Sequence, residues 1–133
     1  MGSILELQCT ECGYSGRFLL GQGMADSKPE RISSYFDGPA AEEVLRLQKD
    51  PETAGYMEFQ RGLGQCKSCG RLMEVPVLRD MRLGGRNILG RCICGGSVRL
   101  WIQDDHEPLQ QDELPVCPDC GAAMSATYAG MWD

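Results

Sequence analysis

Residues 9–13 read CTECG, and this pattern of two cysteines followed by a glycine decides the fold. It recurs as CKSCG at residues 66–70 and as CPDCG at residues 117–121, and a shorter version, CICGG, occupies residues 92–96. A turn of this kind directs both sulfurs to one side, and the glycine can adopt the positive φ that such a turn needs. Four pairs supply the ligands for two tetrahedral metal sites of four sulfurs each.

The cellular compartment decides between metal ligands and disulfides. The chain opens with MGSILELQ, which lacks the basic and apolar segments of a signal peptide, and no apolar run reaches the roughly 18 residues of a membrane span. In the cytoplasm thiols stay reduced, and clustered cysteines are then typically metal ligands. We therefore predict a cytoplasmic protein that binds two zinc ions and no membrane, with iron as the alternative because four thiolates accept both metals.

The way in which the four pairs combine is open at this point. The simplest pairing is sequential and uses all eight cysteines as ligands. One site then consists of Cys9, Cys12, Cys66 and Cys69, and the other of Cys92, Cys94, Cys117 and Cys120. Nested pairing, outer with outer and inner with inner, is the alternative. We interpret the tighter CxC pair as a variant half-site with the same chemistry.

Apolar patterns around the cysteines predict short strands. Residues 4–7 and 17–20 are expected to form a hairpin around the first pair. Residues 71–79 suit an edge strand, because they include Pro76, and residues 98–102 suit a further strand.

The middle of the chain has helical signals. Apolar residues at positions 40, 44 and 47 predict a helix over residues 40–49. Asp50 and Pro51 then predict a second helix that runs to about residue 61, with Tyr56, Phe59 and Leu63 on its core-facing side. Residues 21–39 have several Gly, Pro and Ser residues and are expected to be partly ordered surface.

The cysteine quartets resemble zinc ribbons, the β-hairpin modules found in transcription, translation and RNA-processing proteins. Residues 9–24, a helical insert and CKSCG are similar to uncharacterised bacterial proteins that carry two zinc ribbons. This resemblance implies zinc and a fold, and it implies no activity. The expected fold is a small metal-stabilised α+β protein of two zinc-ribbon modules. The first covers residues 1–83 with a helical insertion at about 39–61, and the second covers residues 84–133.

Two further resemblances imply other functions. CTECGY and CPDCGA resemble the iron-binding knuckles of rubredoxins, which nested pairing would join. The order CxC then CxxC, from Cys92 to Cys120, resembles the zinc centre of redox-regulated holdase chaperones. A rubredoxin-like iron protein and a thiol redox switch are therefore alternatives to structural zinc.

Charge and ligand type bear on function. A site of four cysteines has no open position for a substrate, and the single histidine, His106, is expected to be solvated, so we predict a protein that is not an enzyme.

The net charge is −6, and two zinc sites would bring it to about −10. We predict a macromolecule-binding module with a protein partner. Nucleic acid is the alternative partner, because residues 61–91 have seven bases against two acids, whereas residues 103–113 have five acids and no base.

Overall fold

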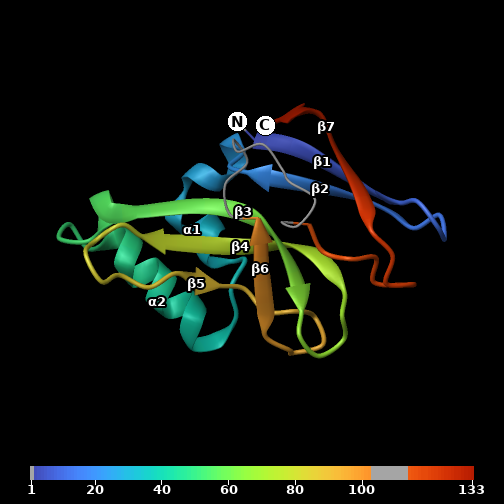
Figure 1. Cartoon of the computed structure of the whole chain (residues 1–133). Helices are drawn as coiled ribbons and strands as arrows, with labels where there is room; N and C mark the ends of the chain where they lie inside the picture. Colours follow the sequence, from blue (N-terminus) through green and yellow to red (C-terminus); the bar gives the residue numbers. More distant parts are fainter. Residues whose placement is uncertain (1, 103–113) are drawn as a thin grey trace.

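The computed structural model describes residues 2–102 and 114–133, apart from the side chain of Ala25. The strands in this part are β1 (Gly2–Cys9), β2 (Ser15–Gly21), β3 (Met57–Cys66), β4 (Leu72–Asp80), β5 (Ile88–Leu89), β6 (Val98–Ile102) and β7 (Met124–Trp132). The helical elements lie between β2 and β3 in the chain, and they are η1 (Met24–Ser27), α1 (Pro29–Ser33), α2 (Gly38–Lys49) and η2 (Ala54–Tyr56). The strands pair antiparallel in one sheet (Figure 1).

Six of the seven strands form two three-stranded units, and the short β5 pairs with β4 at the edge of the inner unit. In the outer unit β1 lies between β2 and β7, and in the inner unit β3 lies between β4 and β6. The units meet where β2 reaches β3, at the single register pair of Gly21 with Arg61. β7 pairs with β1 from one end to the other, so the two ends of the described chain lie side by side (Figure 1).

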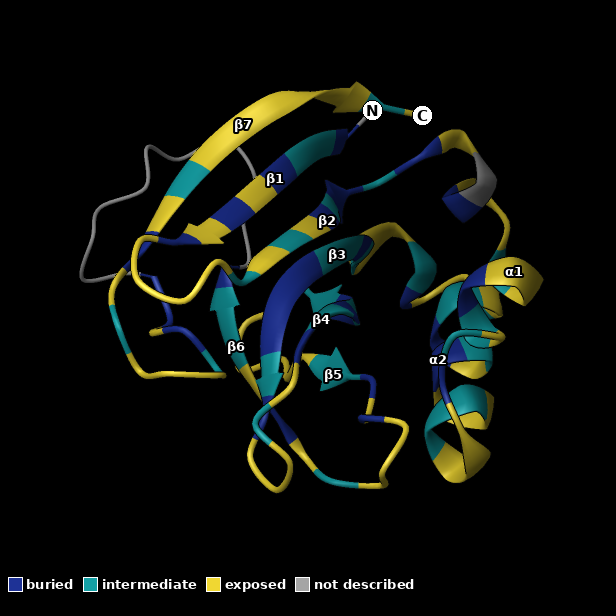
Figure 2. Ribbon diagram, turned by 90° about the vertical axis from the view of Figure 1, so that its right-hand side faces the viewer, coloured by how far each residue is buried: buried dark blue, intermediate teal, exposed yellow. Residues whose placement is uncertain are grey.

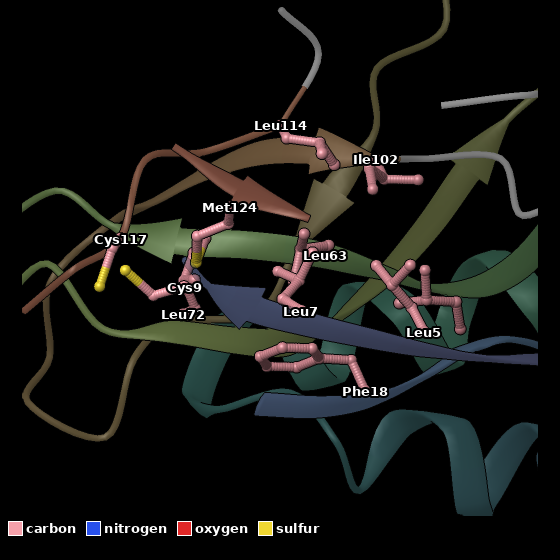
Figure 3. Packing of buried hydrophobic residues seen from close by; sticks show 11 residues of the cluster. Leu5, Leu7, Cys9, Phe18, Leu63, Leu72, Ile102, Leu114, Cys117 and Met124 are labelled. Carbon is pink, nitrogen blue, oxygen red and sulfur yellow. The ribbon is translucent and has the colours of Figure 1, made fainter. Parts of the chain in front are cut away.

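Two of the three apolar clusters in the described residues join the two units and attach the helices to the sheet. The larger cluster joins both units, with Leu5 and Leu7 of β1 packed in the same group as Leu63 of β3 (Figure 3). In the second cluster, α1 and α2 cover one end of the inner unit and bury Val44 and Phe59 (Figure 2). Burial of each such side chain contributes about 2 kcal/mol to stability, so these clusters supply much of the driving force for folding.

Several sequence predictions are confirmed. The hairpin around the first cysteine pair forms, with Leu5 opposite Phe18. The helix predicted over residues 40–49 is α2, and its predicted apolar residues Val44 and Leu47 are buried. The strands predicted at residues 71–79 and 98–102 are β4 and β6, but β4 is not the edge strand predicted from Pro76, because it lies between β3 and β5.

The second helix, predicted for residues 51–61, is wrong. Asp50 does begin a turn, because its carboxylate accepts the N–H of Glu52 at 2.9 Å, but only the short η2 follows. β3 starts at Met57 and pairs with β4 over its whole length. Phe59 and Leu63 are four residues apart, a spacing that puts side chains on one face of a strand as well as of a helix. Both are buried as predicted, whereas Tyr56 is exposed.

The segment between β2 and α2 is also more structured than predicted. The sequence predicts partly ordered surface, but η1 and α1 form there. Asp26 is fully buried, and Ile32 and Phe36 belong to the helical core cluster. This segment therefore anchors the helices on the sheet.

The pairing of strands crosses the predicted module boundary at residues 83 and 84. β6 lies after this position and pairs with β3, which lies before it, and β7 pairs with β1 in the same way. Over residues 2–102 and 114–133, no helix combines the length and the apolar character that crossing a membrane requires.

Candidate metal centres

The cysteines form two groups of four, and the pairing is nested. The outer group consists of Cys9, Cys12, Cys117 and Cys120, and the inner group consists of Cys66, Cys69, Cys92 and Cys94. The predicted sequential pairing is therefore wrong, since each predicted site is split between the two groups. Each group takes one pair from either side of residues 83 and 84.

Strand pairing explains the nesting. In both units, one cysteine pair lies in the turn of a hairpin, and the other pair directly precedes the third strand. Met124, at the start of β7, is opposite Cys9 at the end of β1. In the same way Val98, at the start of β6, is opposite Cys66 at the end of β3. Long-range strand register thus brings each pair to its partner, and local spacing has no part in it.

The sulfur positions fit a tetrahedral metal. In the outer group the Sγ–Sγ distances are 3.5 Å for Cys9 with Cys120 and for Cys12 with Cys117. In the inner group they are 3.5 Å and 3.6 Å. Four sulfurs at about 2.3 Å from Zn²⁺ lie roughly 3.8 Å apart, close to these values. A disulfide needs about 2.05 Å, and all eight cysteines are free thiols. Figure 3 shows the sulfurs of Cys9 and Cys117 turned toward each other at the edge of the larger cluster.

The CxC pair makes the same turn as the CxxC pairs, shortened by one residue. In each CxxC turn, the N–H of the first cysteine donates to the carbonyl five residues later, at 2.8–2.9 Å. In the CxC turn, Cys92 donates to Gly96, four residues later, at 3.2 Å. The hydrogen bond of the glycine after the pair is also shorter by one residue. The N–H of Gly70 donates to the carbonyl of Cys66, four residues back, whereas the N–H of Gly95 donates to the carbonyl of Cys92, three residues back. The missing residue therefore leaves the sulfur geometry intact.

The two glycines of CICGG have different roles. Gly95 has a φ of 87°, and the glycines that follow the other three pairs also have positive φ, at 81°, 77° and 78°. Gly96 permits a close approach instead, because a Cβ there would lie 2.8 Å from the sulfur of Cys66. The shorter turn thus brings its own backbone against the opposite pair, which only glycine allows.

Each pair has one buried and one exposed cysteine, and the first of the pair is always the buried one. The N–H of Cys12 and that of Glu11 point at the sulfur of Cys9 and lower its pKa to about 6. For Cys12, the N–H of Tyr14 would lower the pKa, but the neighbouring sulfurs of Cys117 and Cys120 raise it to about 12.

The inner group repeats this division. The N–H of Cys69, opposed by burial and aided by the N–H of Ser68, lowers the pKa of Cys66 to about 6. The N–H of Gly96 would lower the pKa of Cys94, but the adjacent sulfurs of Cys66 and Cys92 raise it to about 12. A cluster of sulfurs can lose all its protons only when a cation compensates the charge, which is the chemistry of a metal thiolate site.

Sequence reasoning missed a polar cluster where the two units meet. Arg61 donates to both carboxylate oxygens of Asp26, at 3.1 and 3.2 Å, and its guanidinium lies over the rings of Tyr35 and Trp132. Tyr35 also donates to Asp26, at 2.8 Å. Burial would raise the pKa of Asp26, but the hydrogen bonds from Arg61 and Tyr35 outweigh it and hold this pKa below its ordinary value. No sequence motif marks Asp26, since an acid in a Gly- and Ser-rich stretch is ordinarily solvated.

The predicted basic segment, residues 61–91, is only partly available to a partner. Arg61 pairs with Asp26, Arg79 with Glu58 at 3.6 Å, and Arg82 with Asp80 at 2.6 Å. The other bases of the segment, Lys67, Arg71, Arg86 and Arg91, are exposed. His106 and the predicted acidic segment, residues 103–113, lie outside the described residues.

A hollow of about 300 Å³ lies between the two cysteine groups. Its lining includes Tyr14 and Asp119 from the outer turns and Cys69 and Arg71 from an inner turn. The two groups are thus neighbours on one end of the sheet, and a side chain of each sign faces the hollow.

No family model, no curated protein and no solved structure matches this chain. The geometry defines the class of site: two groups of four cysteines that could each hold a metal ion.

Proposed function

We propose that this chain is a zinc protein with two structural sites, and that it acts as a binding module for a protein partner. The observation that carries the proposal is the closed ligand set, because the four sulfurs of each group lie within 4.8 Å of one another. Four thiolates complete the coordination of Zn²⁺ and leave no position for a substrate. The bound metal would supply folding free energy, on the order of 10–16 kcal/mol in zinc-finger peptides.

In this proposal each three-stranded unit is a zinc ribbon, and the inner ribbon is inserted into the outer one between β2 and β7. Each unit has the two features of such a module, a cysteine pair in a hairpin turn and a second pair before a third strand. The larger apolar cluster, which contains residues of both units, then makes them one folding unit.

A protein partner is favoured by apolar side chains in turns outside the core. Leu83 is fully exposed in the loop between β4 and β5, and Ile93 is 89% exposed between two metal ligands. A protein partner would cover such side chains, although single exposed apolar residues also occur on surfaces that bind nothing. The net charge of −6 also disfavours broad attraction to a polyanion.

Nucleic acid is the second candidate, and one observation favours it. Four of the seven bases in residues 61–91 are exposed and have no ion pair among the described residues, namely Lys67, Arg71, Arg86 and Arg91. Binding of this kind would weaken steeply with salt, because phosphate contacts release counterions.

Two measurements on the full chain, purified without added metal, test the proposal. Native mass spectrometry should find two zinc ions per chain. Affinity capture after nuclease treatment should then retain a protein partner in fixed stoichiometry, and chelation should release it. A single iron, or forms with disulfides in place of metal, would favour the rubredoxin-like or redox-switch alternatives. Recovery of nucleic acid alone in a parallel capture without nuclease, lost at high salt, would favour the second candidate.

A further inference from the structure

The two cysteine groups have turns of opposite charge. Each turn is defined as the cysteine pair with one residue before it and two residues after it. In the outer group, residues 8–14 and 116–122 contain two acids, Glu11 and Asp119, and no base. In the inner group, residues 65–71 and 91–96 contain three bases, Lys67, Arg71 and Arg91, and no acid. With each zinc site of four thiolates counted at −2, the outer site and its turns carry about −4, and the inner site and its turns carry about +1.

The three inner bases belong to one place on the surface. Lys67 follows the ligand Cys66, and Arg91 precedes the ligand Cys92. The carbonyl of Arg71 accepts the N–H of Cys66 at 2.9 Å. The four ligand sulfurs lie within 4.8 Å of one another, and the N–H of Lys67 donates to the carbonyl of Ser97 at 2.9 Å, so the three bases belong to two adjoining turns.

These bases are available to a partner. All three are exposed, and over residues 2–102 and 114–133 none of them forms an ion pair. Arg61, Arg79 and Arg82 in the same basic segment all have acidic partners in the fold. A fourth base extends the surface, since Arg99 lies opposite Gln65 and its guanidinium covers the ring of Trp101 at 3.7 Å.

An apolar side chain stands among these charges. Ile93 separates the ligands Cys92 and Cys94 and is 89% exposed, so the shortened turn presents it to solvent. The turn is rigid, because Gly95 and Gly96 are both held by hydrogen bonds to Cys92. Ile93 can therefore make an apolar contact with a partner, while the nearby bases of the inner group attract acidic side chains.

We propose that the inner-group surface, formed by Lys67, Arg71, Arg91 and Ile93, docks an acidic segment of a partner protein that contains apolar residues. The inference rests on the proposed function and names the partner's chemistry. The acids of the segment pair with the three bases, and an apolar residue covers Ile93. A short segment fits better than nucleic acid, because a longer polyanion would extend toward Glu11 and Asp119 of the neighbouring outer turns, which would repel it.

Fluorescence anisotropy with the zinc-loaded full chain tests this docking surface. The probe is a labelled peptide of four Glu-Glu-Leu repeats, and the comparison probes are four Lys-Lys-Leu repeats and a twelve-nucleotide oligothymidine. The test variant replaces Lys67, Arg71 and Arg91 with Ser. The control variant makes the same three changes at Lys28, Arg46 and Arg86, which are also exposed. Two zinc ions per chain in both variants would show that both fold.

The acidic peptide should bind, and the test variant should weaken it about tenfold, because three exposed ion pairs are lost. The control variant should change binding less than about twofold, and Ile93→Ser should weaken it several-fold. Equal loss in the test and control variants would overturn the inference, as would tighter binding of oligothymidine than of the peptide. Absence of peptide binding would overturn it too. The proposed function would survive any of these results if affinity capture still retained a protein partner.

Discussion

The outer and inner cysteine groups have the same ligands and nearly the same turns, but they close loops of very different length. Cys12 and Cys117 are 105 positions apart, whereas Cys69 and Cys92 are 23 positions apart. Loop-closure entropy grows with the logarithm of length, so the outer closure costs about 1 kcal/mol more. A metal in the inner group would therefore stabilise a local three-stranded unit, while a metal in the outer group would join β1 to the segment that leads into β7.

The difference also shows how one chemistry can have two structural roles. The outer group adjoins the larger apolar cluster, which contains Cys9 and Cys117. The inner group adjoins a smaller cluster that contains Cys66 and Cys92. A metal in the outer group would stabilise packing between the units, and a metal in the inner group would stabilise packing within one unit.

Metal removal should have the largest effect and should act on both groups. Chelation at neutral pH is expected to abolish the folded state, since structural zinc contributes on the order of 10 kcal/mol in small domains. Circular dichroism and native mass spectrometry would follow strand loss and metal loss together. A chain that kept its strands after complete metal removal would contradict a structural role for either group.

Single ligand changes should separate the two groups. Cys12→Ser and Cys69→Ser each remove an exposed ligand, so little core packing is lost in either variant. Each should retain one zinc ion, and Cys12→Ser should be more stable than Cys69→Ser by about 1 kcal/mol, because the entropy recovered when the longer loop opens offsets more of the lost metal binding. Urea unfolding with metal content measured in parallel would show this. Equal stabilities would remove loop length as the distinction between the groups.

The polar cluster between the units should be the next largest contribution. Asp26→Ala leaves Arg61 without its buried partner and should cost about 3 kcal/mol. Glu30→Ala is the matched control, because its ion pair with Lys49 is exposed and should contribute under about 1 kcal/mol. Thermal unfolding of both variants with two zinc ions bound would compare them. Similar losses would show that Asp26 does not hold the two units together.

Replacement of Glu74 should have the smallest effect on stability, and it should stabilise the protein instead of destabilising it. Burial raises the pKa of Glu74, and the nearby Arg61 offsets this only in part. A carboxyl with a raised pKa costs stability when it ionises, so Glu74→Gln should stabilise the protein at pH 7. The gain should shrink as pH falls and should vanish below about 4.3, the pKa of a free glutamate, because Glu74 is then neutral in both the folded and the unfolded state. Paired unfolding curves at pH 5 and pH 7 check this, and a gain independent of pH would contradict it.

The sequence predicted features that depend on neighbouring residues. The positive φ after each cysteine pair follows from glycine at residues 13, 70, 95 and 121. The buried face of α2 follows from the spacing of Val44 and Leu47. β3 was missed because Phe59 and Leu63 have a spacing common to helices and strands, and strand pairing with β4 decided between them.

The nested pairing could not be predicted from such local patterns. The four cysteine pairs make nearly identical turns. The residues of one turn therefore do not determine which other turn lies next to it. The answer depends on the register of β7 on β1 and of β6 on β3, which are contacts between distant parts of the chain. The same holds for Asp26, whose partner Arg61 is 35 positions away.

The central claim is the nested arrangement, and metal counts in two double variants test it most directly. Cys9→Ser with Cys117→Ser changes two ligands of the outer group, and Cys9→Ser with Cys66→Ser changes one ligand in each group. By native mass spectrometry, the first variant should keep one zinc ion per chain. The second should keep no zinc ion bound by four sulfurs. Sequential pairing gives the opposite result, so one zinc ion retained by Cys9→Ser with Cys66→Ser, and none by the other variant, would contradict this structure.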